Sequence, residues 1–166
     1  MRIYLATPIH DKLYPITPRP DPEFENSVKS ILGFLRSEGH SVFLALEREE
    51  WGAAIMSGDV CTPKDRDEMQ GADVVVAMVG NPPSGGVQYE LGWATGDDDP
   101  EMRKPVVLLL DDSIRDQYSS LVVPGTGALT NASCLYYEDL PEERLADLSN
   151  ALLAVAPVRC RLLTPS

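Results

Sequence analysis

The feature that most constrains the fold is a pair of apolar runs in the middle of the chain. Residues 72–79 read ADVVVAMV, and residues 105–110 read PVVLLL. Apolar runs without a regular polar alternation are typical of parallel strands that are covered on both faces. Both runs therefore predict central strands of a parallel sheet.

Shorter segments on either side of these runs fit the same architecture. Stretches rich in β-forming residues predict three further strands, at residues 2–6, 41–45 and 133–137. Residues 47–60 are ambiguous. Apolar spacing, capping residues and helix breakers predict five helices. The first begins at Asp21-Pro22-Glu23 and ends at Gly39. The others cover residues 62–70, with Thr62 as N-cap, 87–95, 116–122 and 140–155.

Strands thus alternate with helices along the whole chain. This pattern predicts a doubly wound α/β fold of the flavodoxin or Rossmann type, with five parallel strands in one sheet and helices on both faces. A length of 166 residues is ordinary for one domain. We expect this domain to span residues 1–156 and to be followed by a C-terminal tail at residues 157–166.

The net charge of the chain limits the classes of partner that it can bind. Lys and Arg together number 14 against 26 Asp and Glu, a formal net charge of −12. DNA, RNA and anionic membranes are disfavoured as partners because they carry charge of the same sign. One small phosphate stays compatible, since a local cluster of N–H donors binds it. No leader pattern and no apolar run of roughly 20 residues is visible, so we expect a cytoplasmic protein.

Neither the cysteines nor the acidic residues 97–99 indicate a metal site. Cys61, Cys134 and Cys160 are odd in number and far apart, and no Cys/His ligand spacing is present. This predicts reduced thiols without a zinc site or a disulfide framework. Residues 97–99 read DDD, which a solvated turn explains better than a magnesium site does.

Ligands of parallel sheets bind beyond the carboxyl ends of the strands. Polar or flexible residues follow three predicted strands, at positions 7–10, 84–86 and 111–113. Ser84, Gly85 and Gly86 stand out, because a hydroxyl and free N–H groups at a helix start form an anion site. Glu90 follows about one turn later, where we expect the helix dipole to lower its pKa. A plain glycine turn and an ordinary helix acid explain the same residues.

A resemblance to a known family favours the functional explanation of these residues over the ordinary one. Residues 72–77 (ADVVVA) and 84–94 (SGGVQYELGWA) resemble the signature of the nucleoside 2-deoxyribosyltransferase superfamily, and residues 3–8 (IYLATP) resemble its first strand and loop. The order of elements matches over most of the chain. The resemblance implies retaining glycosyl transfer, in which a carboxylate traps the sugar and an acceptor releases it. It implies no metal or organic cofactor.

The resemblance also implies roles for single residues. Glu90 is the nucleophile that attacks the anomeric carbon, and Tyr4 hydrogen-bonds and orients it. Asp65 matches the carboxylate that handles the nucleobase or its leaving proton, and Asp67 competes for this role. Two ordinary explanations stay open, namely that Tyr4 is a core aromatic residue and that Asp65 is a first-turn helix acid.

Ser84 separates two branches of this family. Transferases of free nucleosides carry Asp six residues before the nucleophile, where it binds the sugar 5′-hydroxyl, whereas the related nucleotide N-hydrolases carry Ser. A carboxylate would repel a 5′-phosphate, while a hydroxyl and helix N–H groups would bind it. Ser84, with Gly85 and Gly86, therefore indicates a 5′-monophosphate substrate.

The resemblance further implies a homodimer or higher homo-oligomer with a shared active site, because a neighbouring subunit supplies a second phosphate ligand in those hydrolases. Ser119 is the candidate ligand and Ser120 the alternative, although either one fits an ordinary surface serine. The base pocket is expected to draw on Ile9, His10 and residues 46–51, including Trp51.

The expected function is therefore hydrolysis of the N-glycosidic bond of a nucleoside 5′-monophosphate, through a covalent glutamyl–sugar intermediate. A nucleoside 2-deoxyribosyltransferase that exchanges bases is the first alternative. A non-catalytic nucleotide-binding module is the second, and Glu90, Tyr4 and Asp65 argue against it. The sequence leaves the base and the sugar, ribose or 2-deoxyribose, open.

Overall fold

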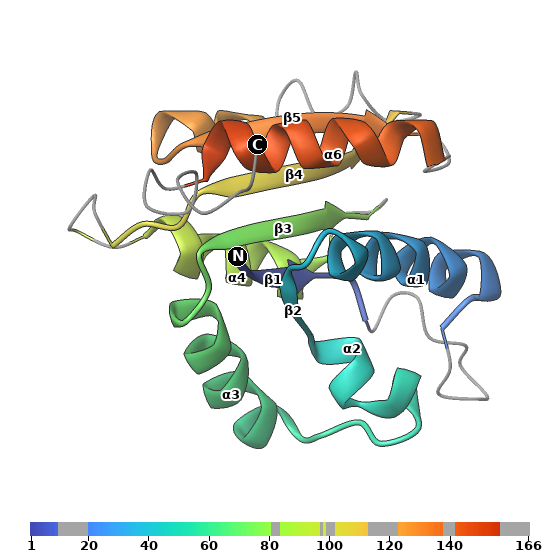
Figure 1. The fold of residues 1–166 in the computed structure, drawn as a ribbon. Coiled ribbons are helices and arrows are strands. Elements are labelled where there is room, and N and C mark those ends of the chain that lie inside the picture. Colours follow the sequence, from blue (N-terminus) through green and yellow to red (C-terminus); the bar gives the residue numbers. More distant parts are fainter. Residues whose placement is uncertain are drawn as a thin grey trace.

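Five parallel strands form one sheet in the order β2-β1-β3-β4-β5 (Figure 1). The structure is a computed structural model, and it describes residues 1–9, 20–80, 84–96, 98, 102–112, 123–137 and 142–156. The strands are β1 (Arg2–Ala6), β2 (Ser41–Leu44), β3 (Val74–Val79), β4 (Val106–Asp111) and β5 (Ala132–Tyr137). The strand order is that of flavodoxin-like folds, and the predicted five-stranded parallel sheet is confirmed.

Helices cover both faces of this sheet, as predicted. They are α1 (Pro22–Ser37), α2 (Ala45–Arg48), α3 (Gly58–Gln70), α4 (Gly85–Thr95) and α6 (Glu142–Val155), with 3₁₀ turns η2 (Glu50–Gly52) and η4 (Val123–Ala128). Among the described residues, no helix is long and apolar enough to cross a membrane.

The alternation of side chains along β1 assigns each face its helices. Ile3 and Leu5 pack in one core cluster with residues of α1 and α6, whereas Tyr4 and Ala6 pack in a second cluster with residues of α3 and α4. Successive side chains of a strand point to opposite faces, so this division follows from the sequence. In Figure 1, α1 and α6 accordingly lie on the near side of the sheet and α4 lies behind it.

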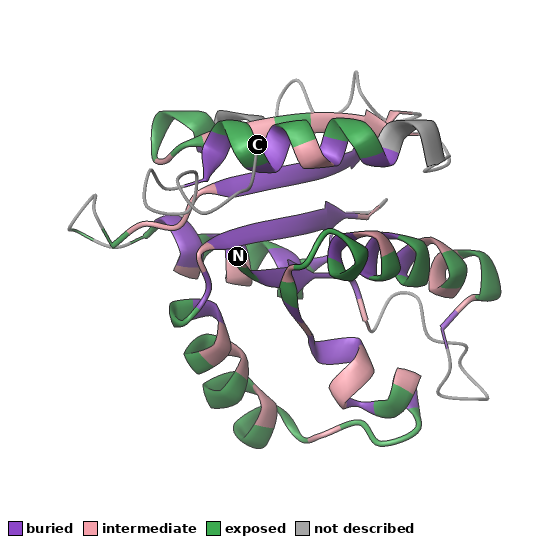
Figure 2. Ribbon diagram, viewed as in Figure 1, coloured by how far each residue is buried: buried purple, intermediate pink, exposed green. Residues whose placement is uncertain are grey.

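The central strands are the most deeply buried part of the molecule. Every residue of β3 is buried, as are the first five residues of β4 (Figure 2). Complete burial of one such Val or Leu side chain contributes about 1.5–3 kcal/mol, which explains why these strands are apolar on both faces.

Several element boundaries match the predictions and others differ. Helix α1 begins as predicted, with the Asp21 carboxylate accepting hydrogen bonds from the backbone N–H groups of Glu23 (3.0 Å) and Phe24 (3.3 Å). It ends before Gly39, whose φ of 80° is easily adopted by glycine. The ambiguous segment 47–60 contains the end of α2, the turn η2 and the start of α3.

The predicted start of α3 at Thr62 is wrong. The helix begins at Gly58, and Ser57 is its N-cap. The backbone N–H groups of Val60 and Cys61 bond to the Ser57 carbonyl at 2.9 and 3.0 Å, which stabilises a turn before Pro63. Pro63 therefore costs the helix one backbone hydrogen bond without ending it.

Three further predictions lie outside the described residues. They are the helix at 116–122, the tail at 157–166 and the first residues of the helix predicted at 140–155. The turn η4 had no counterpart in the sequence-based prediction.

Candidate active site

A cavity of about 350 Å³ opens at the carboxyl ends of β1 and β3, between α3 and α4. This is the edge at which ligands of parallel sheets bind. Glu90, Asp65 and Ser84, which lie far apart in the sequence, all line it. The described residues that line it are Thr7, Ile9, Glu49, Met56, Cys61, Thr62, Asp65, Ser84, Gly85, Gly86, Tyr89, Glu90 and Trp93.

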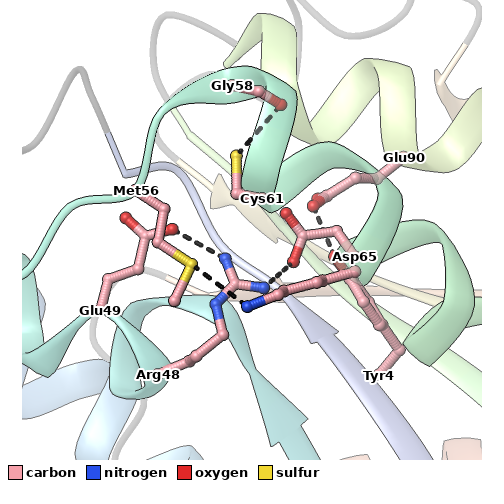
Figure 3. A network of polar contacts seen from close by, with 9 residues as sticks. Tyr4, Arg48, Glu49, Met56, Gly58, Cys61, Asp65 and Glu90 are labelled. Carbon is pink, nitrogen blue, oxygen red and sulfur yellow. Dashed lines mark hydrogen bonds and ion pairs between the residues drawn. The ribbon is translucent and has the colours of Figure 1, made fainter.

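Tyr4 and Glu90 form the central contact of the site. The Tyr4 hydroxyl donates a hydrogen bond to Oε1 of Glu90 at 2.7 Å (Figure 3). Tyr4 is only 1% exposed and reaches Glu90 because β1 directs this side chain to the face that α4 covers. Tyr4 is therefore both a core aromatic residue and a hydrogen-bond partner of Glu90, so the structural and the functional explanation of Tyr4 are compatible.

The environment of Glu90 differs from the prediction. The pKa of Glu90 is raised to about 7, chiefly by burial and also by the charge of Asp65, while the Tyr4 hydrogen bond and the charge of Arg48 oppose this rise. The expected lowering by the helix dipole is wrong in direction. Glu90 is the sixth residue of α4, beyond the first turn where the dipole acts, so desolvation prevails.

Tyr4 remains a donor in this pair. Burial, followed by the charge of Glu90, raises the pKa of the Tyr4 phenol far above its usual value. The phenol therefore keeps its proton and stabilises the ionised form of Glu90 through the hydrogen bond.

Asp65 lies on α3 and belongs to a second polar cluster. Arg48 donates from Nη1 to Oδ1 of Asp65 at 2.6 Å and from Nη2 to Oε1 of Glu49 at 2.7 Å (Figure 3). Burial raises the pKa of Asp65, while the hydrogen bond from Arg48 opposes that rise. Asp67 does not line the cavity that holds Asp65 and Glu90.

The predicted phosphate-binding segment lies at the amino end of α4. Ser84 is the N-cap, is 7% exposed and makes no capping hydrogen bond with its side chain. Gly85 and Gly86 begin the helix and line the cavity. A Cβ added to Gly85 would meet no atom of the described residues within 4 Å, so this glycine leaves open space at the cavity. The N–H groups of a helix start therefore face a space that an anion can occupy.

The remaining predicted residues have different outcomes. Ile9 lines the cavity, whereas His10, Ser119 and Ser120 lie outside the described residues. Trp51, which was predicted for the base pocket, does not line this cavity. Its ring packs against the core cluster of α1, with Lys29 Nζ 4.7 Å from the ring centroid.

Some residues in or next to the cavity were not singled out from the sequence. Arg48 and Glu49 lie in the segment 46–51 that was expected near the base, and their position after the carboxyl end of β2 was the available signal. Trp93, in place of Trp51, supplies a cavity aromatic, one helical turn after Tyr89. In the described part of the chain, no group of three His, Cys, Asp or Glu residues is arranged to hold a metal ion.

Solved structures provide the comparison with known proteins. BlsM is 31% identical and has a TM-score of 0.72, with 99% of this chain and 95% of that chain covered. The CMP N-glycosidase BcmB of Clostridium botulinum is 25% identical and has a TM-score of 0.65, with coverage of 90% and 98%. A conserved protein of Enterococcus faecalis V583, 18% identical with a TM-score of 0.59 and the same coverage, shares the fold. No family model and no curated protein matches the chain.

The sheet order and the cavity at its carboxyl edge define a Rossmann-like α/β protein with a paired tyrosine and glutamate in its site. The structural matches extend over nearly the whole chain. The chain belongs to the nucleoside 2-deoxyribosyltransferase superfamily.

Proposed function

We propose that this protein is a nucleoside 5′-monophosphate N-glycosidase. The observation that carries the proposal is that Glu90, which accepts the 2.7 Å hydrogen bond from Tyr4, lines the same cavity as the amino end of α4. A buried carboxylate next to an anion-binding helix start suits a substrate with an anomeric carbon and a phosphate. The similarity to the CMP N-glycosidase BcmB supports the same reaction class.

In the first step, a carboxylate oxygen of Glu90 attacks C1′ of the sugar while the C1′–N bond breaks. The electron pair of that bond goes to the base, and Asp65 gives the leaving base its proton. In the second step, water attacks C1′ and gives its proton to Asp65, and Glu90 leaves as a carboxylate. The products are the free base and a 5-phosphosugar, and neither step needs a metal or an organic cofactor.

The phosphate is placed at the start of α4 in this proposal. The Ser84 hydroxyl and the N–H groups of the helix start donate to the phosphate oxygens. Hydrogen bonds to charged groups contribute about 1.5–3 kcal/mol each, so a nucleoside without the phosphate should lose about 10²-fold or more in kcat/KM.

Two parts of the proposal concern the surroundings of the site. We propose a homodimer or higher homo-oligomer in which Ser119, or Ser120, of one subunit reaches the phosphate of the next. An enzyme that acts on free nucleotides works where these metabolites are made and used, so the cytoplasm is its proposed compartment.

A chromatographic assay of base release tests the proposal. CMP is the first substrate to try, followed by the other ribo- and deoxyribonucleoside 5′-monophosphates, each beside its matched nucleoside. We expect base release from at least one nucleotide and about 10²-fold slower release from its nucleoside. Equal rates for the two, or base exchange in place of hydrolysis when a second base is added, would favour the transferase.

Ser84 variants separate charge from hydrogen bonding. Ser84→Asp should suppress nucleotide hydrolysis more than Ser84→Ala does, because a fixed carboxylate repels the phosphate whereas alanine removes only one donor. If the two variants retain the same kcat/KM for the nucleotide, the phosphate does not bind at this helix start.

A further inference from the structure

The charges around the cavity are unbalanced. Three carboxylates, those of Glu49, Asp65 and Glu90, line it, and Arg48 is the cation that contacts two of them. These contacts are largely buried, with side-chain exposures of 17% for Arg48, 5% for Glu49 and 13% for Asp65. Charges at this depth are costly unless they are paired, so the contact of Arg48 with both carboxylates stabilises the cluster.

The geometry assigns each carboxylate oxygen a different environment. Arg48 bonds to Oδ1 of Asp65 and to Oε1 of Glu49 through separate nitrogens of its planar guanidinium. In the described part of the chain, Oδ2 of Asp65 has no hydrogen-bond partner, and Figure 3 shows it pointing away from the guanidinium. A rigid fork that bonds to two carboxylates fixes their orientation to one another.

The surrounding backbone and rings hold Arg48 in place. Its Cζ atom lies 5.7 Å from the ring centroid of Phe43, which in turn lies 5.3 Å from the ring centroid of Tyr4. The chain after Glu49 turns through two non-glycine residues with positive φ, Glu50 (50°) and Trp51 (56°). This unfavourable turn ends α2 directly after Arg48 and Glu49.

A guanidinium donates hydrogen bonds and cannot accept them. Where Asp65 is protonated, its carbonyl oxygen is the stronger acceptor and takes the hydrogen bond from Arg48, so the proton is carried by Oδ2. Arg48 is not among the residues that line the cavity, so it acts through Asp65.

Resting on the function proposed above, we propose that Arg48 is a positioning residue that keeps the transferable proton of Asp65 on Oδ2, the oxygen free to reach the base. In the first step, this proton passes from Oδ2 to the base nitrogen as the C1′–N bond breaks. In the second step, Oδ2 takes the proton of the attacking water. Oδ1 stays bonded to Arg48 throughout.

The test compares substrates that do and do not need a proton on the leaving group. Arg48→Met should lower kcat/KM for CMP, or for the best nucleotide found, by about 10²-fold, because a misplaced proton donor loses on that order. The glycoside 4-nitrophenyl 5-phosphoribofuranoside loses 4-nitrophenolate without protonation, so its kcat/KM, which reports the first step, should fall by only a few fold. A merely structural role of Arg48 would lower both rates alike.

Arg36→Met is the matched control. Arg36 makes the same kind of contact with Glu47 of α2, at 2.9 and 2.6 Å, but this pair is over 40% exposed and does not line the cavity. Arg36→Met should leave both rates unchanged. Arg48→Lys keeps the charge but not the fork, and it serves the same comparison should Arg48→Met fail to fold.

A double-mutant cycle completes the test. In an Asp65→Asn background, Arg48→Met should cause little further loss, since the proton that Arg48 positions is already gone. Additive losses, or equal losses for the nucleotide and the nitrophenyl substrate, would overturn the role of Arg48 while leaving the N-glycosidase standing. A wild-type protein that releases base from no nucleotide would overturn both.

Discussion

At the scale of the residue, Glu90 sets the pH dependence of the reaction. Its pKa of about 7 lies above the ordinary value of a glutamate because the carboxyl group is buried, and the nucleophile must be ionised to attack. A rising pH therefore increases the active fraction. With the nitrophenyl substrate, which needs no proton from Asp65, kcat/KM should rise through an apparent pKa of about 7 and level off above it.

Tyr4→Phe tests the effect of the Tyr4 hydrogen bond on the pKa of Glu90. The hydrogen bond from Tyr4 lowers the pKa of Glu90, so its removal should move the rising limb of the pH profile to higher pH. The groups that face Glu90 from the neighbouring elements, Asp65 on α3 and Arg48 on α2, are retained in this variant. A limb near the ordinary value of a glutamate, or one that Tyr4→Phe leaves in place, would contradict this account.

The residues of the site were only partly predictable. Tyr4 and Glu90 lie 86 positions apart, and the family resemblance paired them before their contact was known. Burial reversed the expected direction of the Glu90 pKa, since the desolvation depends on packing that the local sequence does not express. Arg48 and Glu49 are positioned by the turn that follows them, in which Glu50 and Trp51 have positive φ. Positive φ is usually indicated in a sequence by glycine, and neither position is a glycine.

At the scale of the element, the amino end of α4 offers a test of the phosphate site. Gly85→Ala should leave the fold intact, because the added Cβ meets no atom, but the methyl group would occupy space at the cavity. We expect the melting temperature to be unchanged or slightly higher and KM for the nucleotide to rise about 10-fold. Gly92→Ala is the control, as its Cβ also meets no atom and Gly92 does not line this cavity. Equal KM values for the two variants would place the phosphate elsewhere.

The strained turn η2 allows a prediction about stability. A non-glycine residue with φ near 50° costs about 1–2 kcal/mol, and a glycine at this position would relieve that strain. Part of the relief is lost because glycine has greater conformational freedom in the unfolded chain. Glu50→Gly should therefore raise the free energy of unfolding by about 0.5–1 kcal/mol over Glu50→Ala, which keeps the Cβ. Chemical denaturation measures the difference, and a less stable Glu50→Gly protein would show that the turn is not strained.

The elements themselves follow from the sequence to different degrees. The runs in β3 and β4 are apolar because helices cover both faces, so their continuous apolar sequence was enough to locate them. The start of α3 was misplaced because Pro63 resembles a first-turn proline, while the structure continues the helix one turn further toward the amino end.

At the scale of the whole molecule, the shared active site stays a prediction. Glu90→Ala chains and chains changed at both Ser119 and Ser120 should each be inactive. Mixed oligomers should regain partial activity, because some sites then combine an intact Glu90 with an intact serine pair. Activity assays after subunit exchange, together with sedimentation, measure this, and a fully active monomer would contradict it.

The architecture as a whole was predictable because strand and helix signals alternate regularly along the chain. The predicted parallel sheet of five strands and its helices on both faces are confirmed. The order β2-β1-β3-β4-β5 then brings the ends of β1 and β3 together, and with them Tyr4 and the start of α4. Which polar side chains meet above this edge depends on the turns after β2, and these were the ambiguous part of the sequence.

The central claim is that Glu90 attacks the sugar of a nucleoside 5′-monophosphate. Its most direct test is the rate of base release from CMP, or from the best nucleotide found, by the wild-type protein and by Glu90→Gln, which keeps the shape and the Tyr4 contact. We expect the wild-type protein to release free base and 5-phosphosugar, and the folded Glu90→Gln protein to be slower by about 10³-fold or more. Near-normal turnover by a folded Glu90→Gln protein would contradict the account.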